Sequence, residues 1–388
     1  MSACTLRNAT GLDGGTFDLT LAGGRLVPTA LPPGALTVDL QGARVLPGLI
    51  NAHDHLQLNA LPRQPAGSGF RHARDWTGVV AARRRTDRHF AALASLNRDD
   101  RLLFGAVKNL LSGVTTVAHH DPLYPLLSSR HFPLKVVQHY GWSHSLYLDG
   151  EPAVRNSHAR TPPASPWIIH AAEGVNAEAA AEFDRLEALG CIGPNTLLVH
   201  GIALDAAQRQ RLLDAGGGLI WCPSSNLHLF ARTAAVRSLA AAGRIALGSD
   251  SRLSGARDLL EELRLAATLG QVNEAALERM VGADAAALLG LTHQGLLAPG
   301  CPADLLILPP GARLGRVQRH EVRLVIVAGS VRYGDADLVL RVAPDERFSE
   351  VRVDGVRKLL AHAITAQLAR SGLTEPGLEL PDRAGRAA

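Results

Sequence analysis

Short apolar runs alternate with amphipathic stretches over most of the chain. The runs are rich in Val, Ile and Leu, and Ala- and Leu-rich segments such as "NAEAAAEFDRLEALG" separate several of them. Strands that alternate with helices are typical of βαβ units and a parallel sheet. Between residues 47 and 294 the pattern therefore predicts an α/β fold of the (β/α)8 TIM-barrel type.

Seven barrel strands can be recognised from their apolar runs. They read "PGLINAHDH", "GVTTVAHH", "LKVVQHYG", "PWIIHAAEG", "TLLVHG", "GGLIWCP" and "RIALGSD". The fourth strand is hard to place, because residues 145–166 offer neither a clear strand nor a full helix. We expect an abbreviated fourth strand in that interval.

Both ends of the chain carry strand-like text broken by Gly and Pro turns. Residues 1–46 and 295–341 have this pattern, so we expect them to form the two halves of a small β-sandwich domain, with the barrel inserted between them. In residues 342–388 we expect a C-terminal helix within "SEVRVDGVRKLLAHAITAQLARSG", followed by a flexible tail, "TEPGLELPDRAGRAA".

Polar or ionisable residues end nearly every predicted barrel strand. They are His55, His120, His170, His200, Cys222 and Asp250. In a barrel of this type the carboxyl ends of the strands meet at one mouth, where active sites are built. Side chains that are distant in the sequence are therefore expected to meet there.

The first predicted strand ends in two histidines with the spacing of metal ligands. Residues i and i+2 of a strand point to the same side, so His53 and His55 can present two imidazoles to one point while Asp54 points away. Imidazole suits zinc and ferrous iron. Three residues that close later strands could converge on the same point: His170, His200 and Asp250.

These residue types suit hydrolysis of a carbon–nitrogen bond. A divalent cation lowers the pKa of a bound water and so supplies a nucleophile at neutral pH. Glu173, three residues beyond His170, is expected in the loop after its strand, where its carboxyl group can move a proton from water to the departing nitrogen. His200 could polarise the attacked centre, and Asp250 could also accept a proton.

Together these segments resemble the amidohydrolase superfamily, in the branch that contains cytosine, guanine and adenosylhomocysteine deaminases and triazine hydrolases. The matching text, in chain order, is "PGLINAHDH", "HAAEG", "LLVHG", "WCPSSNLHL", "IALGSD" and "LLAPGCPADLLIL". It spans most of residues 45–308, and the set is specific although each piece alone is not.

The resemblance implies a barrel enzyme with one divalent metal, Zn²⁺ or alternatively Fe²⁺. The implied metal ligands are His53, His55, His170 and Asp250. Glu173 is implied as the proton shuttle and His200 as a neighbour of the reacting centre, with Ser225 and Asn226 near the pocket. Binuclear relatives need a carboxylated lysine at the end of the fourth strand. Lys135 begins the third strand, and Lys108 and Lys358 are expected in helices, so a single metal is favoured.

We therefore expect a metal-dependent hydrolase that acts on carbon–nitrogen bonds other than peptide bonds, through hydrolytic deamination of an N-heterocycle. An alternative within the same mechanism is ring opening of a cyclic amide or amidine, as in imidazolonepropionase-like hydrolases. An alternative from a different class is a non-catalytic scaffold. Such relatives typically lose ligands, whereas all six expected positions are filled here.

Composition and charge narrow the choice of partners. A formal charge of +4 is mildly basic, but aromatic residues make up only 4%, which favours a small-molecule substrate over nucleic acid. The four cysteines lie far apart, and no run of about 18 apolar residues occurs, so we expect a cytoplasmic protein without a membrane span. The resemblance also allows a homodimer.

The segment 61–101 is rich in arginine. Its nine arginines are Arg63, Arg71, Arg74, Arg83, Arg84, Arg85, Arg88, Arg98 and Arg101. One interpretation is a solvated helical face. The other is a lid after the first barrel strand that captures a substrate with a carboxylate or phosphate group.

Overall fold

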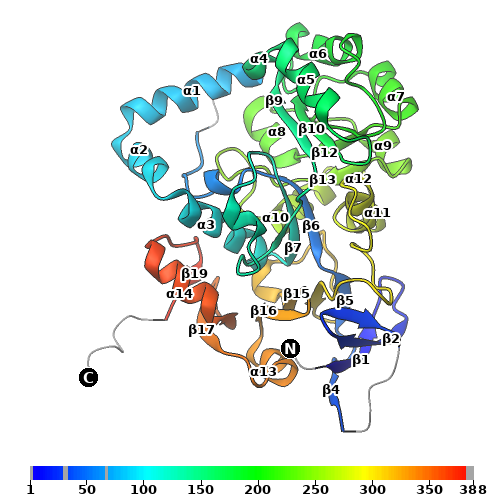
Figure 1. Ribbon diagram of the computed structural model, residues 1–388, viewed down its shortest axis with the longest axis vertical. Coiled ribbons are helices and arrows are strands. Elements are labelled where there is room, and N and C mark those ends of the chain that lie inside the picture. Colours follow the sequence, from blue (N-terminus) through cyan, green and yellow to red (C-terminus); the bar gives the residue numbers. More distant parts are fainter. Residues whose placement is uncertain (1–2, 29–33, 66–68, 382–388) are drawn as a thin grey trace.

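The computed structural model describes residues 3–28, 34–65 and 69–381 of the chain. Its main parts are a set of parallel strands surrounded by helices and a large mixed sheet to which both ends of the chain contribute (Figure 1). Within these described ranges, no helix is long and apolar enough to cross a membrane.

Eight parallel strands follow one another along the chain and form the barrel. They are β6 (Leu49–Asp54), β7 (Val114–His119), β8 (Lys135–Val136), β9 (Gly141–Ser145), β10 (Trp167–Ala171), β11 (Thr196–His200), β12 (Gly218–Trp221) and β13 (Ile245–Leu247). Hydrogen bonds join β6 to β8 in one group and β9 to β13 in another. The ring closes beyond β13, where the amide of Asp250 donates to the carbonyl of His53 at 3.1 Å.

The fourth barrel strand lies earlier in the chain than predicted. β9 reads "GWSHS" and closely follows the third strand. Most of residues 145–166 instead form two helices, α4 (Leu146–Asp149) and α5 (Glu151–Arg160). The prediction of a strand in that interval is wrong, because β9 carries Gly, Ser and His and so lacks the apolar run by which strands are recognised.

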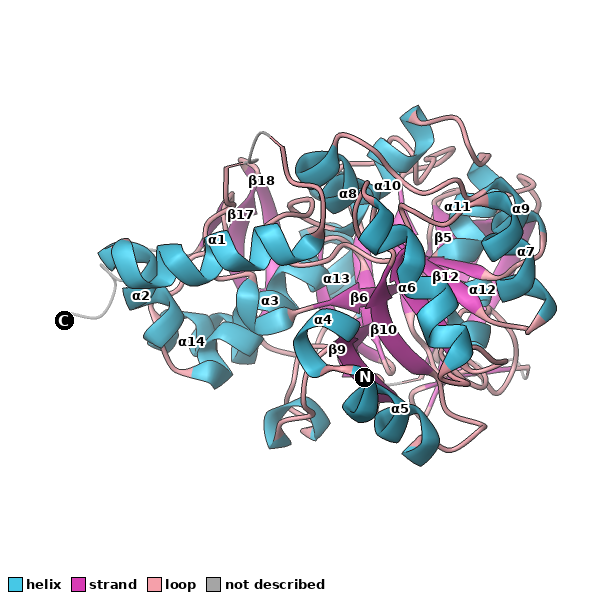
Figure 2. Cartoon of the chain, turned by 90° about the horizontal axis from the view of Figure 1, so that it is seen from above, coloured by secondary structure: helices cyan, strands magenta, loops and turns pink. Residues whose placement is uncertain are grey.

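Helices surround the barrel strands, as Figure 2 shows from above. They are α1 (Ala73–Thr86), α2 (Arg88–Ser95), α3 (Arg98–Leu111), α6 (Ala177–Ala188), α7 (Ala206–Asp214), α8 (Pro223–Phe230), α9 (Arg237–Ala241), α10 (Leu259–Thr268), α11 (Glu274–Met280) and α12 (Ala283–Leu288). Several begin where the sequence supplies an N-cap. The side chains of Asn97, Asn176 and Asp205 each accept a hydrogen bond from a backbone amide in the first turn of α3, α6 and α7.

The strands from both chain ends form one hydrogen-bonded sheet. They are β1 (Cys4–Thr10), β2 (Thr16–Ala22), β3 (Arg25–Val27), β4 (Leu36–Asp39), β5 (Arg44–Pro47), β14 (Leu305–Leu308), β15 (Leu324–Val327), β16 (Ser330–Gly334), β17 (Phe348–Val353), β18 (Val356–Ala361) and β19 (Leu378–Glu379). The two ends join where β5 pairs antiparallel with β14, and α13 (Ala336–Val342) follows β16. The predicted β domain from both chain ends is thus a single mixed sheet.

The C-terminal region differs from the predicted helix. Residues 348–361 form a hairpin of β17 and β18, and only α14 (His362–Ser371) is helical. The Asp354–Gly355 turn between alternating apolar and polar residues is typical of a hairpin. Lys358, expected in a helix, therefore lies on β18, where it bonds to Asp335.

Part of the predicted flexible tail is packed against the molecule. Glu375 is fully buried and accepts hydrogen bonds from Arg252 at 2.7 Å and Arg319 at 2.9 Å. A buried carboxylate needs such cationic partners, and the pairing fixes this segment in place. Residues 382–388 of the predicted tail lie outside the described residues.

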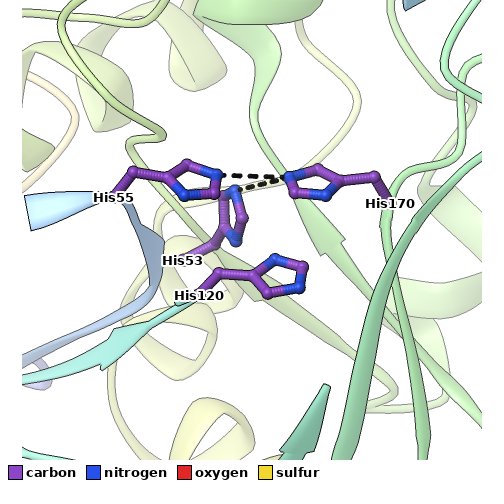
Figure 3. A group of neighbouring side chains, drawn as sticks. All are labelled: His53, His55, His120 and His170. Carbon is purple, nitrogen blue, oxygen red and sulfur yellow. Dashed lines mark hydrogen bonds between the residues drawn. The ribbon is translucent and has the colours of Figure 1, made fainter. Parts of the chain in front are cut away.

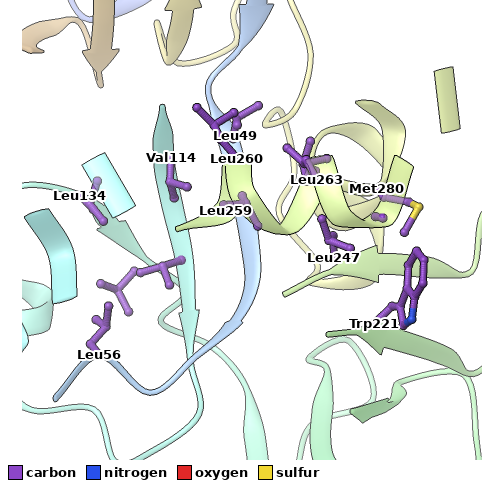
Figure 4. Packing of buried hydrophobic residues seen from close by; sticks show 14 of the residues in the cluster. Leu49, Leu56, Val114, Leu134, Trp221, Leu247, Leu259, Leu260, Leu263 and Met280 are labelled. Carbon is purple, nitrogen blue, oxygen red and sulfur yellow. The ribbon is translucent and has the colours of Figure 1, made fainter. Parts of the chain in front are cut away.

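Apolar side chains fill the space between the barrel strands and their helices (Figure 4). Leu49, Val114 and Leu247 from the strands and Leu260 and Leu263 from α10 are all buried in one cluster. Removing a side chain of this size from water stabilises the fold by ~1.5–3 kcal/mol. This packing fixes the strand ends on which the polar residues of the barrel mouth stand.

Candidate metal centre

Four histidines meet at the mouth of the barrel. His53 and His55 come from the end of β6, His120 follows β7, and His170 belongs to β10 (Figure 3). One nitrogen atom of each imidazole lies within 4.8 Å of those of the other three, and all four side chains are buried. This is the kind of donor set that proteins use for zinc and other transition metals.

Hydrogen bonds to acceptor oxygens orient two of these imidazoles. Nδ1 of His55 lies 2.9 Å from the carboxylate of Asp121, and Nδ1 of His170 lies 2.8 Å from the carbonyl oxygen of His144. A carboxylate or carbonyl oxygen accepts a proton but has none to donate, so each Nδ1 carries the proton. In the neutral form of each ring, the opposite Nε2 atom presents its lone pair to the centre of the cluster, as in metal-binding histidines.

His120 is oriented in the opposite sense. Its Nε2 lies 2.9 Å from the carbonyl oxygen of Ser143 and therefore donates to it. Nδ1 of His120 is buried and has no hydrogen-bond partner within the described ranges. Burial and the charge of His55 hold the pKa of His120 well below its usual value, so the ring is neutral. Burial and the charges of neighbouring histidines, His120 first, likewise hold the pKa of His170 far below its usual value.

The spacing of the Nε2 atoms fits a tetrahedral ion. Nε2 of His170 lies 3.3 Å from that of His53 and 3.4 Å from that of His55. Ligand atoms bound at 2.0–2.1 Å to a tetrahedral zinc ion are about 3.3–3.4 Å apart. Unprotonated nitrogen atoms at this distance repel each other unless a cation lies between them. The residues present therefore fit a divalent metal ion.

Asp250 lies beside this donor set. Its Oδ1 is 3.7 Å from Nε2 of His53 and 4.0 Å from Nε2 of His55. Oδ2 accepts hydrogen bonds from the hydroxyl groups of Ser225 and Ser254, which orients Oδ1 toward the imidazoles. Burial opposes ionisation of Asp250, but the charges of neighbouring histidines outweigh it and lower its pKa. The side chain is therefore an anionic oxygen donor at the rim of the cluster.

Glu173 and His200 face each other across the cavity. Oε1 of Glu173 lies 3.6 Å from Nε2 of His200, and Nδ1 of His200 lies 2.8 Å from Oδ1 of Asn226. Burial and the charge of Asp250 raise the pKa of Glu173 well above its usual value, which favours the protonated form of its carboxyl group. Burial lowers the pKa of His200, whose Nε2 is therefore an acceptor directed at that carboxyl group.

The backbone is strained where two of these residues stand. His200 has a φ of 75° and Asp250 a φ of 52°, a region that costs a residue with a side chain about 1–3 kcal/mol. Gly248 allows the approach of this segment to β6, because a Cβ atom there would lie only 2.6 Å from the Cβ of His53. Strain of this kind is typical of functional sites.

A buried polar network supports the first strand from behind. Asp54 points away from the histidines, as its position on the strand predicts, and its Oδ2 lies 3.2 Å from Nζ of the fully buried Lys108. Lys108 also donates to Asn59 at 2.8 Å and to the carbonyl oxygen of Asp250 at 3.1 Å. One ammonium group thus ties the His53–His55 segment to the segment that carries Asp250.

A cavity of about 430 Å³ opens above the metal centre. Its floor contains His55, His170, Glu173, His200 and Asp250. Its lining also includes Leu58, Trp76, Val80, Tyr147 and Leu253, with Arg84 and Arg85 among the lining residues. An apolar wall with a few convergent polar groups is typical of a site for a small organic molecule.

The structure brings the predicted site residues together at one place. His53, His55, His170, Glu173, His200 and Asp250 all meet at the barrel mouth, and their individual roles stay predictions. The predicted neighbours Ser225 and Asn226 bond to Asp250 and His200.

Sequence reasoning missed one member of the histidine cluster. His120 was expected among the polar strand ends at the barrel mouth but not among the metal ligands, yet it lies in the cluster, and the signal available was its position after the second strand in "VAHHD". Of two further histidines that follow the third strand, His144 lines the cavity, whereas His139 is exposed.

Comparison with known proteins shows which families and enzymes this chain is similar to. Residues 158–332 match the model of the amidohydrolase family. The chain is 39% identical over 134 residues to an 8-oxoguanine deaminase of Pseudomonas aeruginosa, a match that covers 32% of this chain and 30% of that protein. It is 27% identical to a 5-methylthioadenosine/S-adenosylhomocysteine deaminase of Halobacterium salinarum over 88% of this chain and 91% of that protein. The chain is thus similar to the amidohydrolase family over residues 158–332, and to a deaminase over most of its length.

Solved structures share the fold over most of its length. A zinc-bound adenosine deaminase from Xanthomonas campestris superposes with a TM-score of 0.68 at 18% identity, covering 88% of this chain and 96% of that one. The atrazine chlorohydrolase of Arthrobacter aurescens, complexed with zinc, gives a TM-score of 0.67 at 18% identity, covering 88% and 98%. The predicted TIM barrel with a β domain from both chain ends is confirmed.

Proposed function

We propose that this protein is a metal-dependent deaminase that hydrolyses the exocyclic carbon–nitrogen bond of an amino-substituted N-heterocycle. The observation that carries the proposal is the pairing of a histidine cluster that fits a divalent ion with a buried carboxyl group, that of Glu173, 3.6 Å from the imidazole of His200. Deaminases among the relatives support the choice of reaction. Water and the amino-heterocycle are consumed, and the oxo-heterocycle and ammonia are produced.

A single zinc ion is the proposed cofactor, with Fe²⁺ as the alternative. His53, His55 and His170 would hold it through Nε2, with Asp250 as the oxygen donor and His120 next to the same point. When bound, such an ion supplies Lewis-acid activation of water. Solved relatives with bound zinc support zinc as the first choice.

The proton movements follow from the side chains around the cavity floor. The raised pKa of Glu173 favours its protonated carboxyl group, which can donate a proton to the amino nitrogen as the carbon–nitrogen bond breaks. The resulting carboxylate can then take a proton from water. His200 can hold the attacked ring in place through Nε2, and the anionic Asp250 can accept a second proton.

Ring opening of a cyclic amide remains the second candidate, because the same groups would protonate a ring nitrogen. Ammonia release separates the two reactions. A screen of aminated purines, pterins and pyrimidines with zinc-loaded protein should find at least one substrate that releases ammonia. Glu173→Gln should lower its turnover by about 10²–10⁴-fold while zinc content is unchanged. Turnover without ammonia, or a Glu173→Gln variant of full activity, contradicts the proposal.

The oligomeric state is a separate part of the proposal. A homodimer stays a prediction, and sedimentation equilibrium of the purified chain is the measurement that checks it.

A further inference from the structure

Helix α1 forms one wall of the cavity and begins beside Glu173, at the floor of the cavity. The backbone amide of Ala73 donates to the carbonyl oxygen of Glu173 at 3.0 Å, and His72 pairs with Gly174. Six side chains from the helix line the cavity: Trp76, Thr77, Val80, Ala81, Arg84 and Arg85. Residues with this spacing share one side of a helix. The whole cavity-facing side of α1 is thus in reach of a bound molecule.

The three consecutive arginines at the end of α1 are used differently. Arg83 donates to Asp87 at 3.0 Å and to Gln64 at 2.7 Å, so its charge is already paired. Arg84 and Arg85 are exposed residues that line the cavity, and neither side chain has a hydrogen bond or a carboxylate partner within the described ranges. Basic residues in the last turn also favour a helix through its dipole. Water can solvate these exposed guanidinium groups, but neither water nor the dipole explains why both residues line the cavity.

The surroundings of Arg84 do not neutralise it. Burial lowers the pKa of Arg101, and the positive charges of Arg84 and Arg98 lower it further, so several cations lie close together here. The carboxylates of the cavity floor are engaged elsewhere, since Glu173 faces His200 and Asp250 accepts hydrogen bonds from serine hydroxyls. An anionic group entering the cavity would therefore find unpaired guanidinium groups.

The length of the helix sets the distance between this charge and the apolar wall. Arg84 follows Trp76 by eight residues, which corresponds to about 12 Å along the helix axis. A heterocycle at the floor, an uncharged arm along Trp76 and Val80, and an anion at the arginines would use the whole cavity of about 430 Å³. Guanidinium groups suit carboxylate and phosphate because they can bind two oxygens at once.

We propose that the substrate carries a carboxylate or phosphate group on an arm that reaches from the heterocycle to Arg84 and Arg85. The inference rests on the proposed function, which supplies the heterocycle end. The two arginines would determine substrate specificity by binding the anionic group. They would lie far from the carbon–nitrogen bond that breaks.

The first test compares three substrates that differ only in the arm: adenosine, its 5′-monophosphate and its 5′-carboxylate. In the Arg84→Ala/Arg85→Ala double variant, kcat/KM for the preferred anionic substrate should fall by about 10–100-fold, with no change for adenosine. Comparing kcat/KM for the 5′-monophosphate with kcat/KM for the 5′-carboxylate shows which anion is preferred. Arg88→Ala is the matched control, because Arg88 is exposed on α2 and does not line the cavity.

A second test does not depend on turnover. Binding of inosine, inosine 5′-monophosphate and inosine 5′-carboxylate is measured by calorimetry on the zinc-loaded protein and on the double variant. Tighter binding of an anionic ligand that disappears in the double variant supports the inference, even if no ammonia is released in any assay. Equal affinity for charged and neutral ligands, or equal losses for both, overturns it. Ammonia release without anion preference leaves the deaminase proposal intact.

Discussion

The Nε2 atoms of His53 and His170 lie 3.3 Å apart, although the two residues are 117 positions apart in the sequence. The distance equals the edge of a zinc-centred tetrahedron to within about 0.1 Å. The opposite nitrogen of His170 is fixed by the carbonyl oxygen of His144, so the close approach is held by the fold.

Replacing His170 removes the donor that bridges both histidines of the first strand. His170→Ala should lower the bound zinc of the dialysed protein by roughly tenfold or more, because three nearby nitrogen donors are reduced to two. Inductively coupled plasma mass spectrometry measures the metal content. His139→Ala, at an exposed histidine, should retain full metal content. Unchanged zinc in His170→Ala would falsify the proposed ligand set.

Asp121 orients His55 without lying among the clustered donors. Its carboxylate accepts from Nδ1 of His55 and from Gln57. Asp121→Asn keeps the shape but removes the negative charge that fixes the ring, and zinc affinity should fall by about 10–100-fold. Competition with a chromophoric chelator measures the affinity. An affinity equal to that of the wild-type chain would show that the contact is only structural.

Lys108 and Asp54 form a fully buried ion pair behind the first strand. Lys108→Met leaves the Asp54 carboxylate without its cation and should lower the free energy of unfolding by about 3–5 kcal/mol. The double variant Asp54→Asn/Lys108→Met removes both charges and should recover part of that loss. Urea unfolding of chelator-treated protein measures the change in the free energy of unfolding without a contribution from metal binding. Additive losses in the double variant would contradict the pairing.

Asp354 should make stability depend on acid pH. Burial opposes its ionisation, but the hydrogen bond and charge of Arg319 and the charge of Arg257 outweigh it and lower its pKa. A lowered folded-state pKa stabilises the fold above the unfolded value of about 3.9, and this contribution is lost as pH falls through the folded pKa. The stability difference between wild type and Asp354→Asn should therefore shrink below about pH 4. Urea unfolding midpoints at pH 7 and at roughly pH 3.5 measure it, and a constant difference would count against it.

Local patterns were enough to predict most of the barrel. Apolar runs, most of which end in His, Cys or Asp, identified seven strands, and the i, i+2 spacing placed His53 and His55 on one side with Asp54 on the other. The fourth strand escaped because "GWSHS" has no apolar periodicity. It is a strand because its backbone bonds to β10, and such pairing between segments leaves little trace in local composition.

The C-terminal prediction failed for a related reason. Val and Leu in "SEVRVDGVRKLLAHAITAQLARSG" fit both a helix and a strand, and only the pairing of β17 with β18 decides for the hairpin. The order of the segment around Glu375 depends on Arg252 and Arg319, which belong to other parts of the chain.

The sequence by itself determined which residue types stand at the strand ends, and hence the predicted metal chemistry and the resemblance to a known family. Only the tertiary structure decided that His120 joins the cluster, that Asp250 lies beside two imidazoles, and that Arg84 and Arg85 face the cavity while Arg83 does not. The physical reason is that side-chain identity and spacing are local properties. Distances between donors, burial and the pairing of charges depend on segments that meet only when the barrel closes.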